Sequence, residues 1–268
     1  MKRMISDMNR RLRAAPLVGP LLMRVSALER MTLAVIVTAT LAFYVFLVLA
    51  QDVLAGETFS LDEHILLLFR DATDRMSPLG PPWFEEAMRD LTALGGTTLL
   101  TFVTLAALAY LLLEGKRHTA ILVAVSVAGG TILSSVLKWG IGRPRPDLVP
   151  HGMAVYTASF PSGHSTMSAV VYLTLGALLA RAQPRQSVKV FLLGLAVGVT
   201  VIVGVSRVYL GVHWPSDVMG GWALGAGWAC LCWLAMLWLQ SQGEVEREDM
   251  EEVMAPRRDQ IHAPDRRA

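Results

Sequence analysis

Three polar clusters interrupt the apolar second half of the chain, and their residue types suit the binding and transfer of phosphate. The first cluster runs from Lys138 to Pro146, the second from Pro161 to His164, and the third from Ser206 to Asp217. Arginine offers a planar fork that matches phosphate oxygens, lysine offers a compact charge, and backbone N–H groups at a helix start point towards an anion. The predicted phosphate ligands are Lys138, Arg145, Ser162, Gly163 and Arg207.

Two histidines and an aspartate supply groups for proton transfer and bond formation. His213 and Asp217 lie four residues apart, around Pro215, and this spacing suits the first turn of a helix. A carboxylate beside an imidazole fixes its tautomer and stabilises its cationic form, so we predict that His213 is a nucleophile supported by Asp217. His164 lies on a different predicted helix and is the predicted general acid for the leaving alkoxide.

The remaining polar residues of the clusters add one cation and no metal site. Arg143 has two interpretations: an additional ligand of a phosphate or headgroup, or an exposed basic residue of a loop. No acidic pair or histidine cluster has the spacing of metal ligands. We therefore expect neither a metal nor another cofactor.

The elements that position these clusters are predicted to be membrane-spanning helices. Of the 268 residues, 53% are hydrophobic and 17% are charged, whereas a soluble domain has about 25% charged residues. A net charge of +2 is too small to indicate a nucleic-acid partner. We predict an all-α, integral membrane bundle of six helices, each close to the roughly 17–25 residues that a span requires. The predicted spans are Met31–Ala50, Thr97–Leu113, Thr119–Leu137, Ser165–Ala180, Val190–Val205 and Val218–Leu239.

The segment between the first two predicted spans has a helical pattern of its own. Leu61, Ile65 and Leu68 recur at helical spacing among charged residues, and a second such run follows after the break at Pro78–Pro82. Apolar residues on one face and charges on the other are typical of amphipathic helices. We therefore predict two short amphipathic helices that lie on the membrane or cap the bundle.

The basic residues indicate the orientation in the membrane. Lysine and arginine gather in residues 1–30, in the connections after the second and fourth predicted spans, and in the tail after Leu239. The positive-inside rule assigns such segments to the cytoplasm. We predict a multi-pass protein of the inner (plasma) membrane, with both termini cytoplasmic and the three clusters facing the periplasm or exterior. Residues 1–30 then form a basic segment, residues 31–242 the six-span domain, and residues 243–268 a charged, disordered tail.

Together, the three clusters resemble the signature of the type 2 phosphatidic acid phosphatases (PAP2), a superfamily that includes vanadium haloperoxidases and bacterial acid phosphatases. The signature reads Lys, six residues, Arg-Pro; then Pro-Ser-Gly-His; then Ser-Arg, five residues, His, three residues, Asp, and the chain matches it throughout between Leu99 and Leu239. The resemblance implies a phosphohistidine intermediate on His213, a supporting carboxylate at Asp217, an acid at His164 and no metal.

The predicted function is that of a metal-independent membrane lipid phosphatase. Outward-facing members of the family commonly recycle undecaprenyl diphosphate, and an extra cation at Arg143 would favour a diphosphate, so this lipid is the first predicted substrate. Phosphatidate, phosphatidylglycerol phosphate and a lipid A phosphate are the alternatives. A non-catalytic headgroup-binding or transport protein would have no use for His164, His213 and Asp217, and six spans argue against a haloperoxidase. The sequence gives no oligomeric state.

Overall fold

A computed structural model describes residues 27–57, 59–71, 74–147 and 157–241, and this part of the chain is helical without a named strand. The prediction of an all-α fold is therefore confirmed for these residues. The predicted charged tail and nearly all of the basic segment 1–30 lie outside them. In chain order the helices are α3 (Ala27–Ala55), α4 (Phe59–Leu67), α5 (Pro82–Ala93), α6 (Thr97–Leu113), α7 (Arg117–Ile141), α8 (Gly163–Arg181), α9 (Gln186–Tyr209) and α10 (Pro215–Ser241).

Five of the described helices, α3 and α7 to α10, are long and apolar enough to cross a membrane. Helices α5 and α6 reach that length only as a pair, which bends by 43° at the break between them. The described residues therefore hold five candidate spans by length and composition, or six if the bent pair counts as one. Helix α7 extends beyond the predicted span Thr119–Leu137, so Lys138 lies inside its last turns rather than after it.

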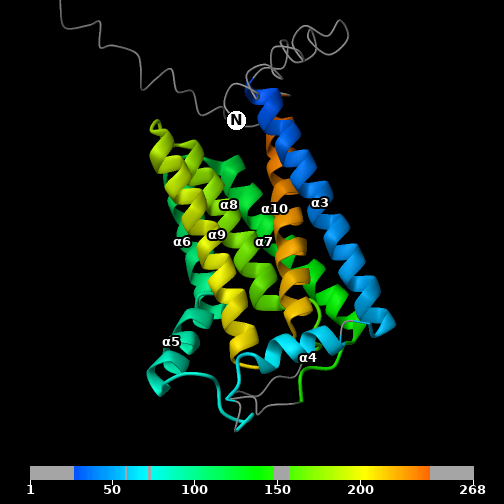
Figure 1. The fold of residues 1–268 in the computed structure, drawn as a ribbon. Helices are drawn as coiled ribbons and strands as arrows, with labels where there is room; N and C mark the ends of the chain where they lie inside the picture. The colour runs from blue at the N-terminus through cyan, green and yellow to red at the C-terminus, as the bar shows by residue number, and fades with distance from the viewer. Residues whose placement is uncertain (1–26, 58, 72–73, 148–156, 242–268) are drawn as a thin grey trace, which may run out of the picture.

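Helix α8 lies inside the bundle, packed between α9, α10 and α7, while α3 lies along α10 (Figure 1). Small residues make the α8–α10 contact close. A Cβ atom added at Gly225 would lie 2.4 Å from the carbonyl oxygen of Thr166, and one at Gly221 would lie 2.8 Å from that of Ser162. Membrane helices pack closely through small residues because lipid supplies no hydrophobic force between them. This contact fixes the start of α8 against the start of α10.

The two short helices α4 and α5 lie at one end of the bundle, beside the end of α9 (Figure 1). The ring of Tyr209, the last residue of α9, packs edge-on against Phe84 at 5.3 Å between centroids. Its hydroxyl donates to the carbonyl oxygen of Leu79 at 2.9 Å, and Arg70 donates to its backbone carbonyl at 2.8 Å. The segment between α3 and α6 is thus attached to the end of the bundle by buried contacts.

The break between α5 and α6 is held from α8. The hydroxyl of Tyr172 donates to the carbonyl oxygen of Leu94 at 2.7 Å. A Cβ atom at Gly95 would lie 2.4 Å from Val203 and 3.3 Å from His164, so only glycine allows this approach. The backbone at the bend therefore packs directly on the start of α8 and on α9.

Substitution of Gly225 by alanine tests the close contact of α8 and α10. We expect Gly225→Ala to lower the free energy of unfolding by about 1–3 kcal/mol, because the backbone of Thr166 must move. The control is Gly198→Ala on α9, where an added Cβ atom meets nothing within 4 Å. Thermal unfolding in detergent checks both variants, and equal midpoints would contradict the packing described above.

Candidate active site

All the predicted site residues lie at the end of the bundle that α4 and α5 cover, where α7 and α9 end and where α8 and α10 begin (Figure 1). The structure therefore brings the three sequence clusters together. Lys138 is on α7, Arg145 on the connection after it, Ser162, Gly163 and His164 at the start of α8, Arg207 on α9, His213 on the α9–α10 connection and Asp217 on α10.

The ring of His213 has its two nitrogens in opposite surroundings. Its Nδ1 lies 3.3 Å from Oδ2 of Asp217, and its Nε2 lies 3.0 Å from Nη1 of Arg145. A guanidinium only donates hydrogen bonds, so Nε2 accepts and the ring proton resides on Nδ1. Burial lowers the pKa of His213 to about 3, against the opposing effect of Asp217. The ring is therefore neutral near pH 7, with the Nε2 lone pair directed towards a cation.

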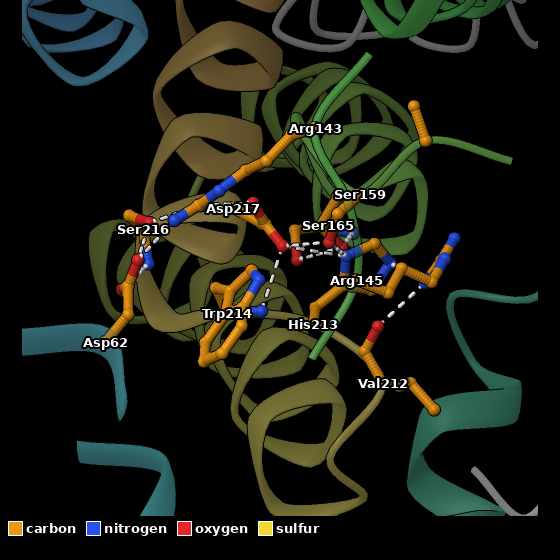
Figure 2. Close-up of polar contacts among 12 residues, drawn as sticks. Asp62, Arg143, Arg145, Ser159, Ser165, Val212, His213, Trp214, Ser216 and Asp217 are labelled. Atoms are coloured by element: carbon orange, nitrogen blue, oxygen red, sulfur yellow. Dashed lines mark hydrogen bonds and ion pairs between the residues drawn. The ribbon is translucent and has the colours of Figure 1, made fainter. Parts of the chain in front are cut away.

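Asp217 is completely buried and accepts hydrogen bonds from several directions (Figure 2). Its Oδ2 accepts from the backbone N–H of Trp214 at 2.9 Å and from the hydroxyl of Ser159. Its Oδ1 accepts from Nη1 of Arg143 at 2.6 Å. These donors hold the carboxylate in one orientation and favour its ionised form. Asp217 is thus a fixed negative charge behind His213.

Three cations surround the other side of the site. Lys138 donates to the carbonyl oxygen of Ala158 at 2.7 Å, and Arg145 donates to that of Val212 at 2.7 Å. Arg207 is 2% exposed and donates to the hydroxyl of Thr92 at 3.1 Å. None of the three cations forms an ion pair with a carboxylate in the described part of the chain. Unpaired buried charge is costly, so this arrangement is suited to an anionic ligand.

The start of α8 adds backbone donors to the same site. Ser162 is the N-cap residue, and its hydroxyl accepts from the N–H of Ser165 at 3.4 Å. Its own N–H donates to the carbonyl oxygen of Asp217 at 2.9 Å, so the prediction that this N–H points at an anion does not fit the geometry. The N–H groups of Gly163 and His164 have no acceptor among the described residues. The backbone donors that remain for an anion are therefore the N–H groups of Gly163 and His164, rather than that of Ser162.

His164 is half-buried, and its imidazole has no hydrogen-bond partner in the part of the chain that the structure describes. It lies within electrostatic reach of Arg207, Arg145 and Lys138. Its ring is therefore close to the bound anion that these cations would hold, without being tied to a fixed acceptor. Such a group can exchange a proton with a ligand.

The structure contradicts both interpretations of Arg143. The side chain is buried rather than exposed in a loop. Its Nη1 donates to Asp217 and to the hydroxyl of Ser216, at 2.6 Å and 2.7 Å, and its Nη2 donates to Oδ2 of Asp62 at 2.7 Å (Figure 2). The guanidinium faces carboxylates on the side of Asp217 away from the three cations, so the predicted additional phosphate ligand does not fit this geometry.

Sequence reasoning missed the residues that support the site from outside the three clusters. Ser159 lies just before the second cluster, and Thr92 lies on α5, far away in the sequence. Asp62 left a usable signal, because it is four residues before Leu66 and shares that apolar face of α4. A charged residue on a buried face normally has a charged or hydrogen-bonding partner, so Asp62 could have been predicted to form a buried ion pair.

Comparisons with known proteins identify the family to which the chain is similar. Residues 119–241 match the model of the PAP2 superfamily. Phosphatidylglycerophosphatase B of Bacillus subtilis (strain 168) is 34% identical over 187 residues, which cover 68% of this chain and 87% of that protein. Undecaprenyl-diphosphatase of Sulfolobus acidocaldarius is 28% identical over 149 residues, covering 54% of this chain and 65% of that protein.

A solved structure extends the similarity to the fold. The crystal structure of a transmembrane PAP2-type phosphatidylglycerolphosphate phosphatase from Bacillus subtilis matches with a TM-score of 0.66 and 30% sequence identity. The match covers 79% of this chain and 98% of that one. Phosphatidylglycerophosphatase B and this crystal structure are both matched over most of their length, so the chain belongs to the PAP2 superfamily, among its membrane lipid phosphatases.

Proposed function

We propose that the protein hydrolyses the terminal phosphate of phosphatidylglycerol phosphate through a phosphohistidine on His213. That the protein is a lipid phosphatase follows from its family. The observation that carries the mechanism is the Nε2 lone pair of His213, which is neutral, backed by Asp217 and directed towards Arg145. A nucleophilic nitrogen beside a cation that can hold the phosphoryl group is the arrangement that direct attack on phosphorus requires.

In the first step, the phosphate oxygens bind Lys138, Arg145 and Arg207 together with the free N–H groups at the start of α8. The Nε2 of His213 attacks phosphorus, and the bond between phosphorus and the lipid oxygen breaks. His164 gives its proton to the leaving alkoxide. The phosphorylated ring becomes positively charged, and Asp217 stabilises it through the Nδ1 proton.

In the second step, water attacks the phosphohistidine. His164 takes a proton from that water, because the acid of the first step is the base of the reverse proton transfer. The bond between phosphorus and Nε2 breaks, its electron pair returns to the nitrogen, and inorganic phosphate leaves. His213 is then neutral again and His164 is protonated, so the cycle is complete.

Charge on the transferring phosphoryl group is offset by the fixed cations of the site. The described residues hold no group of three or more His, Cys, Asp or Glu side chains that could bind a metal ion. We propose that the reaction is independent of metal, which is consistent with the PAP2 family.

The proposed substrate differs from the first one predicted from the sequence. That prediction, undecaprenyl diphosphate, relied partly on Arg143 as a ligand of a second phosphate, and Arg143 faces Asp62 and Asp217 instead. The relative covered over 87% of its length is a phosphatidylglycerophosphatase. Undecaprenyl diphosphate remains the second candidate, because another relative is an undecaprenyl-diphosphatase.

Substitution of the two histidines tests the mechanism. We expect His213→Ala to lower kcat by at least about a thousandfold, because no nucleophile remains. His164→Ala should lower kcat by about a hundredfold and still form some phosphoenzyme, since attack precedes its role as a base. Phosphate release and an acid-labile, base-stable phosphoenzyme are the measurements. His64→Ala, at an exposed position on α4, is the control, and full activity in His213→Ala would exclude the mechanism.

A panel of purified lipids tests the substrate. We expect a higher kcat/KM with phosphatidylglycerol phosphate than with undecaprenyl diphosphate or phosphatidate, and unchanged rates in excess EDTA. Phosphate release from detergent-solubilised protein is measured with and without added Mg²⁺. A higher kcat/KM with undecaprenyl diphosphate would contradict the proposed substrate and would favour the second candidate. Activity lost in EDTA and restored by Mg²⁺ would contradict metal independence.

We also propose that α5 and α6 form one bent span, which gives six spans, cytoplasmic termini and an active site facing the outside of the inner membrane. The six spans are supported by α5 and α6, which are long and apolar enough to cross a membrane as a pair bent by 43°. The orientation is supported by the basic residues in the segments that flank the spans. Reporters fused before Met31 and after Leu239 should both read cytoplasmic, and one inserted near Gly80 should read external. Termini on opposite sides would indicate five spans, and a cytoplasmic Gly80 would reverse the orientation.

A further inference from the structure

A buried network of three charges lies behind the proposed nucleophile. The guanidinium of Arg143 joins Asp62 on α4, at 2.7 Å, to Asp217 on α10, at 2.6 Å. The side chains of Arg143, Asp62 and Asp217 are 1%, 4% and 0% exposed. We call these residues the Asp62–Arg143–Asp217 network. Its outer member lies on a helix that the PAP2 signature does not include.

We propose that Asp62 and Arg143 are positioning residues that hold Asp217, and through it His213, in the geometry required for attack on phosphorus. The proposal rests on the proposed function of His213 as nucleophile. Neither residue contacts the side of His213 that faces the three cations. Both act through the carboxylate that receives the Nδ1 proton.

Asp62 also fixes the helix turn that carries Asp217. Its Oδ1 accepts the backbone N–H of Ser216 at 2.8 Å, and its Oδ2 accepts the hydroxyl of the same residue. That hydroxyl in turn accepts from Nη1 of Arg143 at 2.7 Å. The first turn of α10 is therefore capped from α4, one residue before Asp217. Arg143 contacts both other members of the network, and Asp62 and Asp217 each have further hydrogen-bond partners outside it, which restricts the directions in which Asp217 can turn.

The arrangement is better explained by positioning than by stability alone. A buried ion pair often adds little net stability over well-packed apolar residues, because both charges lose their hydration. Attachment of α4 to the bundle needs no charge, since Leu66, one turn away, is already completely buried against it. The charges add a fixed orientation, because a guanidinium that donates to two carboxylates restricts the planes in which they can lie.

The network also has an electrostatic effect on the nucleophile. The charged groups that face His213 are Asp217 from α10, Arg145 from the α7–α8 connection and Arg207 from α9. Among the described residues, Arg143 contacts Asp217, and Asp217 contacts His213. Arg143 pairs with two carboxylates. Without the negative charge of Asp62, Arg143 offsets more of the negative charge of Asp217, and Asp217 then stabilises a positively charged imidazole less. Formation of the phosphohistidine slows, while phosphate binding by Lys138 and the other cations is unaffected.

The first test is Asp62→Asn in the full-length protein in detergent. Asparagine keeps an oxygen for the N–H of Ser216, but it removes the negative charge and replaces the oxygen that accepts from Arg143 with an NH2 donor. We expect kcat to fall at least about tenfold with KM nearly unchanged, and the acid limb of kcat/KM to move to lower pH by about half a unit. Asp62→Glu restores the charge and should recover part of kcat. Glu63→Gln removes the same charge from the next, exposed position of α4 and should change neither.

Binding of orthovanadate gives a second readout that needs no turnover, because vanadate would bond to the same nitrogen of His213. Its dissociation constant, measured by thermal shift, should rise in Asp62→Asn and not in Glu63→Gln. A wild-type protein that releases phosphate from no lipid would refute the proposed function, and the vanadate comparison would still decide whether Asp62 acts on His213.

A double variant, Asp62→Leu with Arg143→Met, replaces the Asp62–Arg143 pair with apolar side chains, and it leaves Asp217 with its neutral donors Trp214 and Ser159. We expect it to unfold at a lower temperature than the wild type, because Asp217 loses the ion pair with Arg143, and we expect its folded fraction to remain slow. The proposal is overturned if Asp62→Asn has wild-type kcat and pH profile, if Glu63→Gln has the same effect, or if the double variant is fully active. It is also overturned if the loss in Asp62→Asn reflects only a smaller fraction of folded protein.

Discussion

The hydrogen bond between the buried carboxylate of Asp217 and Nδ1 of His213 is the interaction on which the rest of the site depends. It determines which nitrogen carries the proton, and so which nitrogen has a free electron pair. The carboxylate can stay charged in this dry position only because Arg143, Trp214 and Ser159 donate to it. Much of the surrounding structure therefore serves to keep one negative charge in place.

The opposite requirement applies on the other side of His213, where positive charge must stay available. Lys138, Arg145 and Arg207 are held by neutral acceptors, which orient them and leave their charge uncompensated. A carboxylate at these positions would compete with the phosphate. The site thus has one half in which the charge of Asp217 is neutralised by its donors, and another half whose unpaired cations are suited to the proposed phosphate.

The sequence was sufficient for the parts of the site that follow from local spacing. The four-residue interval from His213 to Asp217 is a local feature and brings the two side chains together as predicted, and a helix begins directly after Ser162 as expected. The environment of Arg143 was not predictable in this way, because its two carboxylate partners come from distant segments and only tertiary packing brings them together. The bend before α6 was not predictable for a similar reason, because it depends on contacts with α8.

The short helix α6 has a consequence for the surrounding lipid. Its 17 residues extend about 25 Å, whereas the hydrocarbon core of a bilayer is about 30 Å thick. In the bent span that we propose, α6 makes up most of this thickness and α5 turns away from its axis by 43°, so a thinner bilayer beside the bend is the better match. The headgroup layer would then descend to the level of the bend, where Thr92 holds Arg207. A lipid diffusing along this face would bring its phosphate to the depth of the cation without leaving the membrane, so hydrophobic mismatch itself would contribute to substrate delivery.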